Sequence, residues 1–271
     1  MHPARLLPFC ASLVLFTCVA SCDSREGDLP SPTFVPPPAG KDRRIHEIRD
    51  PESPSKAAHR TQVQVSGAVV VAVDQFDETR NGRSAGTIYV QDLGSKEPYS
   101  GISLFNPSFI PGNLRVGAGD ALDLRGEFQE NQDIPIKFAP GAFLVQLSNA
   151  IGTFRFDADV PAPVEIDIDD LADYAKGGKW LNMLVTVKNV TVHGNPFGGG
   201  GRRSYNLLPQ ITSGPVACDA PFPKVPTLVN ALADLAPLEL TDQTVIKSVT
   251  GVVTFFCNLQ IAPRSVADVV L

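Results

Sequence analysis

Residues 120–128 read Asp-Ala-Leu-Asp-Leu-Arg-Gly-Glu-Phe, and this stretch decides the fold class. Leu122, Leu124 and Phe128 alternate with charged residues, which is the period-two pattern of a strand with one buried face. Gly126 stands on the apolar face, where a bend or a close backbone approach needs a residue without a side chain. The stretch therefore predicts a β-strand in the wall of an all-β structure.

Four neighbouring segments carry similar signals. Residues 62–73 place valines on one face and are interrupted by Gly67, which predicts a bulge. Residues 87–91, 101–105 and 143–147 are shorter strand candidates. The composition agrees, because 24 Pro and 22 Gly among 271 residues favour short strands and turns over helices. Five short strands with glycines at bends predict a small closed or partly closed β-barrel over residues 60–165.

A second module is expected over residues 166–271. A short helix at 169–174, capped by Asp167 or Asp169, precedes a strand at 183–192. The apolar phase of that strand changes at Lys188 and Asn189, which predicts a bulge. We expect a helix at 228–235 and a late strand in which alternate residues from 249 to 261 share one face.

The order of motifs in the first module resembles a known family of OB-fold barrels. The motifs are Val65-x-Gly67, Tyr89-Val90-Gln91-Asp92, Gly101-Ile102-x-Leu104-Phe105, Val116-Gly117-x-Gly119-Asp120 and Leu124-x-Gly126. Such modules accompany extracellular and wall-anchored bacterial nucleases and also occur in bacterial lipoproteins. The resemblance spans about residues 62–150, and residues 180–187 resemble the opening of the next barrel. It implies an all-β fold with minor helix, built from two tandem OB-like barrels.

Residues 1–21 have the character of an export signal. Arg5 precedes an apolar run from Leu6 to Ala20, which is too short to span a bilayer as a helix. The run ends Val19-Ala20-Ser21-Cys22, which resembles the bacterial lipobox and predicts diacylation of Cys22. The alternative is ordinary secretory cleavage, with Cys22 an incidental thiol. The lipobox implies a lipid-anchored protein of the bacterial cell envelope, and leaves the choice of inner or outer membrane undecided.

Residues 22–59 are expected to form a lipidated N-terminus and a disordered, Pro-rich tether. They hold seven prolines between positions 30 and 54, with scattered charges and no apolar periodicity. Arg43, Arg44 and Arg49 suit contact with anionic lipid, although the acidic residues among them favour a simple solvated linker.

Two cysteines remain for the folded modules, and they are expected to form a disulfide. Cys218 and Cys257 both lie in the second module, and an exported protein occupies a compartment where disulfides persist. Cys257 shares a predicted strand face with apolar residues, whereas Cys218 lies in a Pro-rich loop. A bridge would therefore fix that loop to the barrel. The alternative is two unrelated thiols, with Cys257 buried as a small apolar residue.

Catalytic signatures are scarce. His193 is the one histidine of a folded module, no Gly-x-Ser-x-Gly motif occurs, and the acidic cluster at 167–173 lacks the pattern of a calcium loop. The glycine run at 198–201 departs from a phosphate loop and is interpreted as a hairpin loop. We therefore expect a non-enzymatic protein that needs no cofactor or metal.

Candidate ligand-binding residues follow from the barrel prediction, because OB barrels bind ligands on the face of strands two and three. In the first module this face implicates Tyr89, Gln91, Tyr99 and Phe105, although Tyr89 and Phe105 are equally placed to be core residues. In the second module Arg202 and Arg203, with Tyr205, are the best local candidates for contact with an anion.

Two binding functions remain open. The first is an envelope lipoprotein whose barrels bind a protein or glycan partner. The alternative is a nucleic-acid-binding accessory module, which the family resemblance supports. The net charge of −6 opposes this alternative, because strong nucleic-acid binders carry a basic surface.

Overall fold

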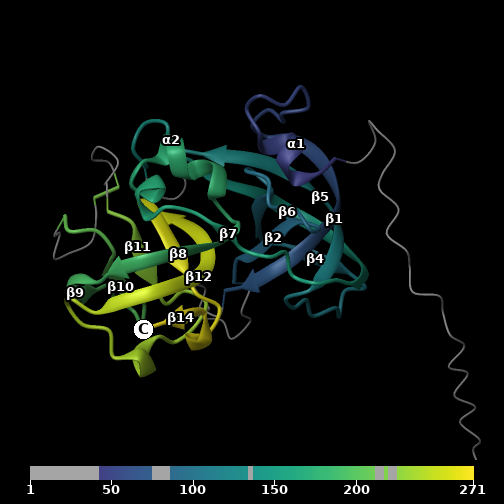
Figure 1. Ribbon diagram of the computed structural model, residues 1–271. Coiled ribbons are helices and arrows are strands. Elements are labelled where there is room, and N and C mark those ends of the chain that lie inside the picture. Colours follow the sequence, from purple (N-terminus) through teal and green to yellow (C-terminus); the bar gives the residue numbers. More distant parts are fainter. Residues whose placement is uncertain (1–42, 75–85, 134–136, 211–216, 219–224) are drawn as a thin grey trace, which may run out of the picture. The chain divides into compact units, whose positions relative to one another are not determined.

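The computed structural model describes residues 43–74, 86–133, 137–210, 217–218 and 225–271 (Figure 1). All of these residues belong to one compact unit, Pro32–Leu271. Their strands form two sheets and their helices are short, so the predicted all-β class with minor helix is confirmed. The predicted signal peptide, Cys22 and residues 23–42 of the predicted tether lie outside the described residues.

The first sheet contains the strands that the opening stretch predicts. Its members are β1 (Thr61–Val73), β2 (Ile88–Asp92), β3 (Gly101–Phe105), β4 (Ser108–Ile110), β5 (Asp120–Asn131) and β6 (Leu144–Asp157). The spatial order is β3-β2-β1-β5-β6-β4, and β3 also pairs with β6 in parallel. The hydrogen-bonded path through five strands therefore returns to β3. Strand β6 is much longer than the segment 143–147 that alternation indicated, and β4 was not expected.

Glycines shape this sheet as the sequence suggested. The pairing of β1 with β5 shifts register between Val65 and Ala68, and Gly67 between them has a φ of 68°. The Gly67 N–H donates to Asp123 Oδ1 at 3.2 Å, so the predicted bulge is confirmed. Gly126 serves a close approach instead, because a Cβ there would lie 3.2 Å from the Cα of Ala150.

The second sheet follows the same plan. It contains β7 (Val164–Glu165), β8 (Leu184–Thr191), β9 (His193–Phe197), β10 (Ser204–Asn206), β11 (Thr227–Val229), β12 (Val245–Phe256), β13 (Asn258–Ala262) and β14 (Val269–Val270). The order is β7-β8-β12-β13-β11-β10-β9, with β14 paired to β12. Figure 1 shows β8 and β12 side by side. Because β9 follows β8 after the single residue Val192, we count β8 and β9 as one continuous strand. The path from this strand through β12, β13, β11 and β10 returns to it, which makes a second circuit of five strands.

Three local predictions in this sheet were wrong. Residues 228–235 form no helix, because the start of this segment belongs to β11. The backbone hydrogen bonds of β11 to β10 and β13 prevail over the helix-like spacing of its apolar residues. The late segment is a hairpin instead of a single strand, because the chain reverses at Cys257, whose φ is 64°, although its alternate residues share a buried face as predicted. The β8–β12 register runs through Lys188 without a shift, and the change of phase comes from Asn189, whose φ is 53°.

The remaining helical turns are short. They are α1 (Ile45–Arg49), η1 (Ile168–Ala172), α2 (Tyr174–Gly177), η2 (Gly178–Trp180), η3 (Ala236–Leu238) and η4 (Val266–Asp268). Asp167 caps η1, since its side chain accepts from the Asp169 N–H, which confirms one of the two predicted caps. Asp173 caps α2 in the same way.

The structure corrects the prediction of a disordered tether for residues 43–59. Ile45 and Ile48 of α1 have no exposed surface, and Arg49 is 5% exposed. The buried carboxylate of Asp92 accepts from the backbone N–H groups of Ile45 and His46, at 2.7 and 2.9 Å. The prolines of this segment indicated a disordered tether. The apolar pair Ile45 and Ile48 is nevertheless three positions apart, which is the spacing of one helix face.

The two sheets also share contacts. A separate apolar cluster joins residues of β1 and β2 to residues of the second sheet: Val71, Ala72, Tyr89, Leu184, Val229, Ala231, Leu232, Val252 and Ala262. Within it, the Leu184 N–H donates to Oε1 of the fully buried Gln91 at 3.0 Å. We call this cluster, with Gln91, the junction.

Candidate functional site

The predicted ligand face of the first sheet lies largely within the junction. Tyr89 is 7% exposed and packs in the apolar cluster. Gln91 accepts from Leu184 and donates through Nε2 to the Ser95 carbonyl at 2.8 Å. Strand β2 is buried along its whole length. Tyr89 is therefore neither a surface residue nor part of the main core, since it packs between the two sheets.

Tyr99 and Phe105 have different surroundings. The Tyr99 N–H donates to the Lys179 carbonyl at 2.7 Å, and the Arg49 guanidinium lies 5.7 Å from the centre of its ring. Partial burial raises the pKa of the Tyr99 hydroxyl. Phe105, at the end of β3, is 56% exposed. Of the four residues predicted in this module, Phe105 presents the largest free surface.

The predicted residues of the second module do not form one site. Arg202 makes an ion pair with the buried Asp74 of the first module, with an N–O distance of 3.3 Å. Arg203 has an exposed side chain, and its N–H donates to Asn230 Oδ1. Tyr205, in β10, is 2% exposed. The glycine run lies between the paired strands β9 and β10, as the hairpin interpretation requires.

An apolar strip lies on the outer face of the first sheet, and sequence reasoning found only one of its members. It consists of Phe105, Ile110 and Ile151, which are 56%, 56% and 44% exposed. Their strands are adjacent, because β6 pairs in parallel with both β3 and β4. Beneath the strip, the ring of Phe109 fills the space over Gly152, where a Cβ would lie 2.8 Å from the ring. We keep the name apolar strip for the three exposed residues.

Two arginines flank a pocket farther along the same sheet. The pocket has a volume of about 340 Å³ and is lined by Arg43, Gln62, Val63, Gln64 and Arg125. Gln64 is paired with Arg125, and Arg125 with Ile151 of the apolar strip. The strip and this arginine pocket are therefore joined by one row of neighbouring residues. No sequence pattern predicts the pocket, because its residues come from three separate segments.

A second pocket, of about 290 Å³, lies beside the junction. Its walls are mainly apolar, and one side carries Arg264, Ser265 and Asp268. Arg264 Nη2 lies 3.3 Å from Asp268 Oδ1, and the Asp268 carboxylate also accepts from two backbone N–H groups. This carboxylate neutralises the pocket's cation.

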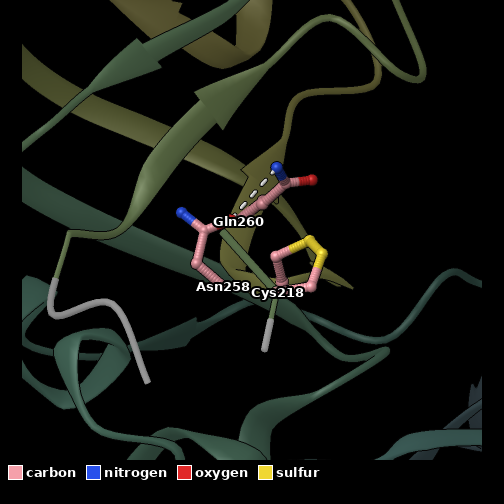
Figure 2. Close-up of a disulfide and its surroundings, with 4 residues drawn as sticks. Cys218, Asn258 and Gln260 are labelled. Atoms are coloured by element: carbon pink, nitrogen blue, oxygen red, sulfur yellow. Dashed lines mark hydrogen bonds between the residues drawn. A yellow bond between two sulfur atoms is a disulfide. The ribbon is translucent and has the colours of Figure 1, made fainter. Parts of the chain in front are cut away.

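The cysteines of the second module are placed for a disulfide, as predicted. The Cα atoms of Cys218 and Cys257 are 4.5 Å apart, within the usual range for a bond. Figure 2 shows the pair beside Asn258 and Gln260. Asn258 is buried and donates through Nδ2 to the Val225 carbonyl at 2.7 Å, while its Oδ1 accepts from Gln260 at 3.4 Å. The bridge thus fixes the Cys218 segment to the β12–β13 turn.

Buried titratable groups lie where the helical segment meets the two sheets. Burial lowers the pKa of the Arg49 guanidinium to about 10, so the group stays charged at neutral pH. Burial also raises the pKa of Tyr174 to about 12, and its hydroxyl donates to the Phe143 carbonyl at 2.5 Å. These groups hold segments together through hydrogen bonds to backbone carbonyls.

Neither protein-family models nor curated proteins match this chain. Within the described ranges, no cluster of three or more His, Cys, Asp or Glu side chains is arranged to hold a metal ion. The described part of the chain also has no helix with the length and apolar character needed to cross a membrane. A proposal for the function must therefore rest on the arrangement of the exposed side chains.

Proposed function

We propose that this protein is a non-enzymatic lipoprotein of the bacterial cell envelope, held by lipid on Cys22, whose two OB-like barrels bind a protein partner. The observation that carries the binding role is the apolar strip. Large exposed apolar residues gathered on adjacent strands are typical of surfaces that contact another protein. The two five-strand circuits support the OB-like assignment, since a closed path of this size is that of a small barrel.

The junction supports a protein partner over a glycan. OB barrels usually take oligonucleotides or oligosaccharides on strands two and three. Here β2 and the second-sheet strands β10 and β11 are buried throughout. Binding surfaces must therefore lie elsewhere, and the apolar strip is more suited to apolar side chains than to sugar hydroxyls.

The same burial weakens the nucleic-acid alternative. Binding of single strands relies on exposed aromatic side chains for base stacking. Tyr89 and Tyr205 are both less than a tenth exposed, and Gln91 has no exposed surface. The acidic net charge of −6 points the same way.

Photo-crosslinking in living cells tests the protein-partner proposal. A photoreactive amino acid replaces Phe105 or Ile110, and the matched control replaces Val245, which is 61% exposed on the second sheet. We expect one discrete adduct with another envelope protein from positions 105 and 110, lost when Ile151 is changed to Asp. Equal adducts from position 245, or none from the strip, would contradict the proposal. Retention of a single-stranded DNA probe that depends on Phe105 would favour the alternative.

The anchor is tested separately. Changing Cys22 to Ser should abolish labelling by a fatty-acid analogue and release the protein from the membrane fraction, because diacylation needs the thiol. Changing Cys18 to Ser is the matched control and should alter neither result. Membrane association unchanged by Cys22→Ser would overturn this half of the proposal.

A further inference from the structure

The arginine pocket is fixed in place by the backbone. Arg43 joins β1 through an isolated parallel bridge: its N–H donates to the Gln64 carbonyl and its carbonyl accepts from the Ser66 N–H, both at 3.2 Å. Gln64 stands directly opposite Arg125 on β5. Both arginines therefore project from paired backbone, with Val63 between the two glutamines on β1. The donors of the pocket are held by the sheet and not by a loop.

The donors exceed what the protein itself uses there. Arg43 Nη1 donates to the Ser55 carbonyl at 2.8 Å, which orients a guanidinium that has five N–H donors in all. Each glutamine adds a further amide donor pair. No acidic side chain belongs to the described lining of the pocket.

The nearest acidic residues along the strands are engaged with other groups. Glu127, opposite Gln62, accepts from Gln129 at 2.8 Å. Asp123 pairs with Arg155 at 3.3 Å and accepts from the Gly67 N–H. The pocket therefore keeps a local excess of positive charge in a protein whose net charge is −6.

We infer that the arginine pocket binds a phosphate group. Two guanidinium forks and two amides offer more donors than the two oxygens of a carboxylate can use, whereas a phosphate presents three or four oxygens. Arginine forks match the geometry of phosphate oxygens and bind them in pairs. Inorganic phosphate and the headgroup of a phospholipid share this chemistry. The inference is independent of the protein partner proposed for the apolar strip.

Calorimetric titration of the full chain in detergent tests the inference. The probes are inorganic phosphate, the soluble headgroup glycerophosphoglycerol, and acetate. Binding of either phosphate compound at least tenfold tighter than acetate is expected, and the tighter of the two identifies free phosphate or a lipid headgroup as the source. The variants are Arg43→Gln and Arg125→Gln, and Lys247→Gln is a control of equal charge change on β12 of the second sheet.

We expect each pocket variant to weaken phosphate binding roughly tenfold or more, which is the scale of one lost charge-assisted hydrogen bond. The Lys247→Gln control should stay within about twofold of the unchanged protein, since Lys247 does not line the pocket. Melting temperatures verify that the exposed substitutions leave the fold intact. Absence of phosphate binding, acetate binding as tight as phosphate, or equal weakening by Lys247→Gln would overturn the inference.

Discussion

Arg49 is a buried cation whose donors are used by backbone carbonyls from two regions of the chain. Its Nη1 donates to the carbonyls of Gly101 and Leu181, and its Nη2 donates to that of Gly178 at 3.1 Å. The sequence placed this arginine in a solvated tether, because charge alone gives no indication of burial. Its role depends on carbonyls more than fifty residues away.

Replacing Arg49 with Met should lower the free energy of unfolding by about 3 kcal/mol, because the carbonyls stay buried without their donor. Urea denaturation of the purified protein measures this loss. Arg44→Met is the control, since Arg44 is exposed and its change should stay within about 0.5 kcal/mol. Similar losses from the two variants would mean that Arg49 contributes no more than a surface residue.

His46 makes the docking of α1 depend on pH. The hydrogen bond from its Nδ1 to the buried Asp92, 3.2 Å long, raises its pKa above the ordinary value of 6.5. Glu97, 3.7 Å from Nε2, and Glu47 act in the same direction, whereas burial opposes them. Because the folded pKa is the higher one, this stabilisation is complete below about pH 6.5 and is lost as pH rises through the folded value.

The stability advantage of the unchanged protein over His46→Gln should therefore be largest at and below about pH 6.5 and shrink as the pH rises above it. Urea denaturation across this range measures the difference. Lys96→Gln serves as a control, because Lys96 is exposed. A difference that grows with pH would show that His46 is stabilised in its neutral form.

At the scale of elements, the strands could be predicted where alternation was clean. Residues 62–73 and 101–105 match β1 and β3 closely, and Gly67 marked its bulge, because each pattern depends on neighbouring residues. The helix predicted at 228–235 is absent because Leu228 lies in β11 and pairs with Ile261 of β13, and Leu235 is buried outside any helix or strand. The turn at Cys257 gave no signal, because the residue is neither Gly nor Asn.

The disulfide belongs to this scale, since it joins a loop to a hairpin. Cys218 and Cys257 are separated by 39 positions, and closing a loop of that length stabilises the fold by about 4 kcal/mol on the chain-entropy account. Adding reductant should therefore lower the free energy of unfolding by about that amount. The Cys218→Ala variant should start at the lower value and respond no further to reductant. Unchanged stability of the original protein in reductant would contradict the bond.

At the scale of the whole molecule, the junction could not be predicted. Val71 and Tyr89 belong to the junction and not to the main apolar core, and the unbroken apolar run at 68–73 does not indicate which segment covers its second face. Only the partner residues on the second sheet, such as Leu184, give them a reason to be apolar. The same limit applies to the candidate site. Phe105 could be predicted because its strand has a clear sequence pattern, whereas Arg43 and Arg125 are brought together only by the fold.

The junction predicts that both sheets unfold together. Gln91→Leu removes the acceptor of the buried Leu184 N–H and should cost about 2 kcal/mol, in a single transition. Fluorescence of the one Trp, Trp180, and far-ultraviolet circular dichroism should give coincident curves. Gln210→Leu, at an exposed position, is the control and should change little. Two separate transitions in the unchanged protein would contradict the shared junction.

The position of α1 has a mechanical consequence. Any tension applied to the chain upstream of residue 43 enters the fold at the bridge from Arg43 to β1 and passes next to α1. The hydrogen bonds to Asp92 and from Arg49 resist that pull before it passes along the chain to the start of β1. Detachment of α1 would lengthen the connection by roughly 3.3 Å per released residue. Such a release would add chain length upstream of β1 and so relax the force on the sheets.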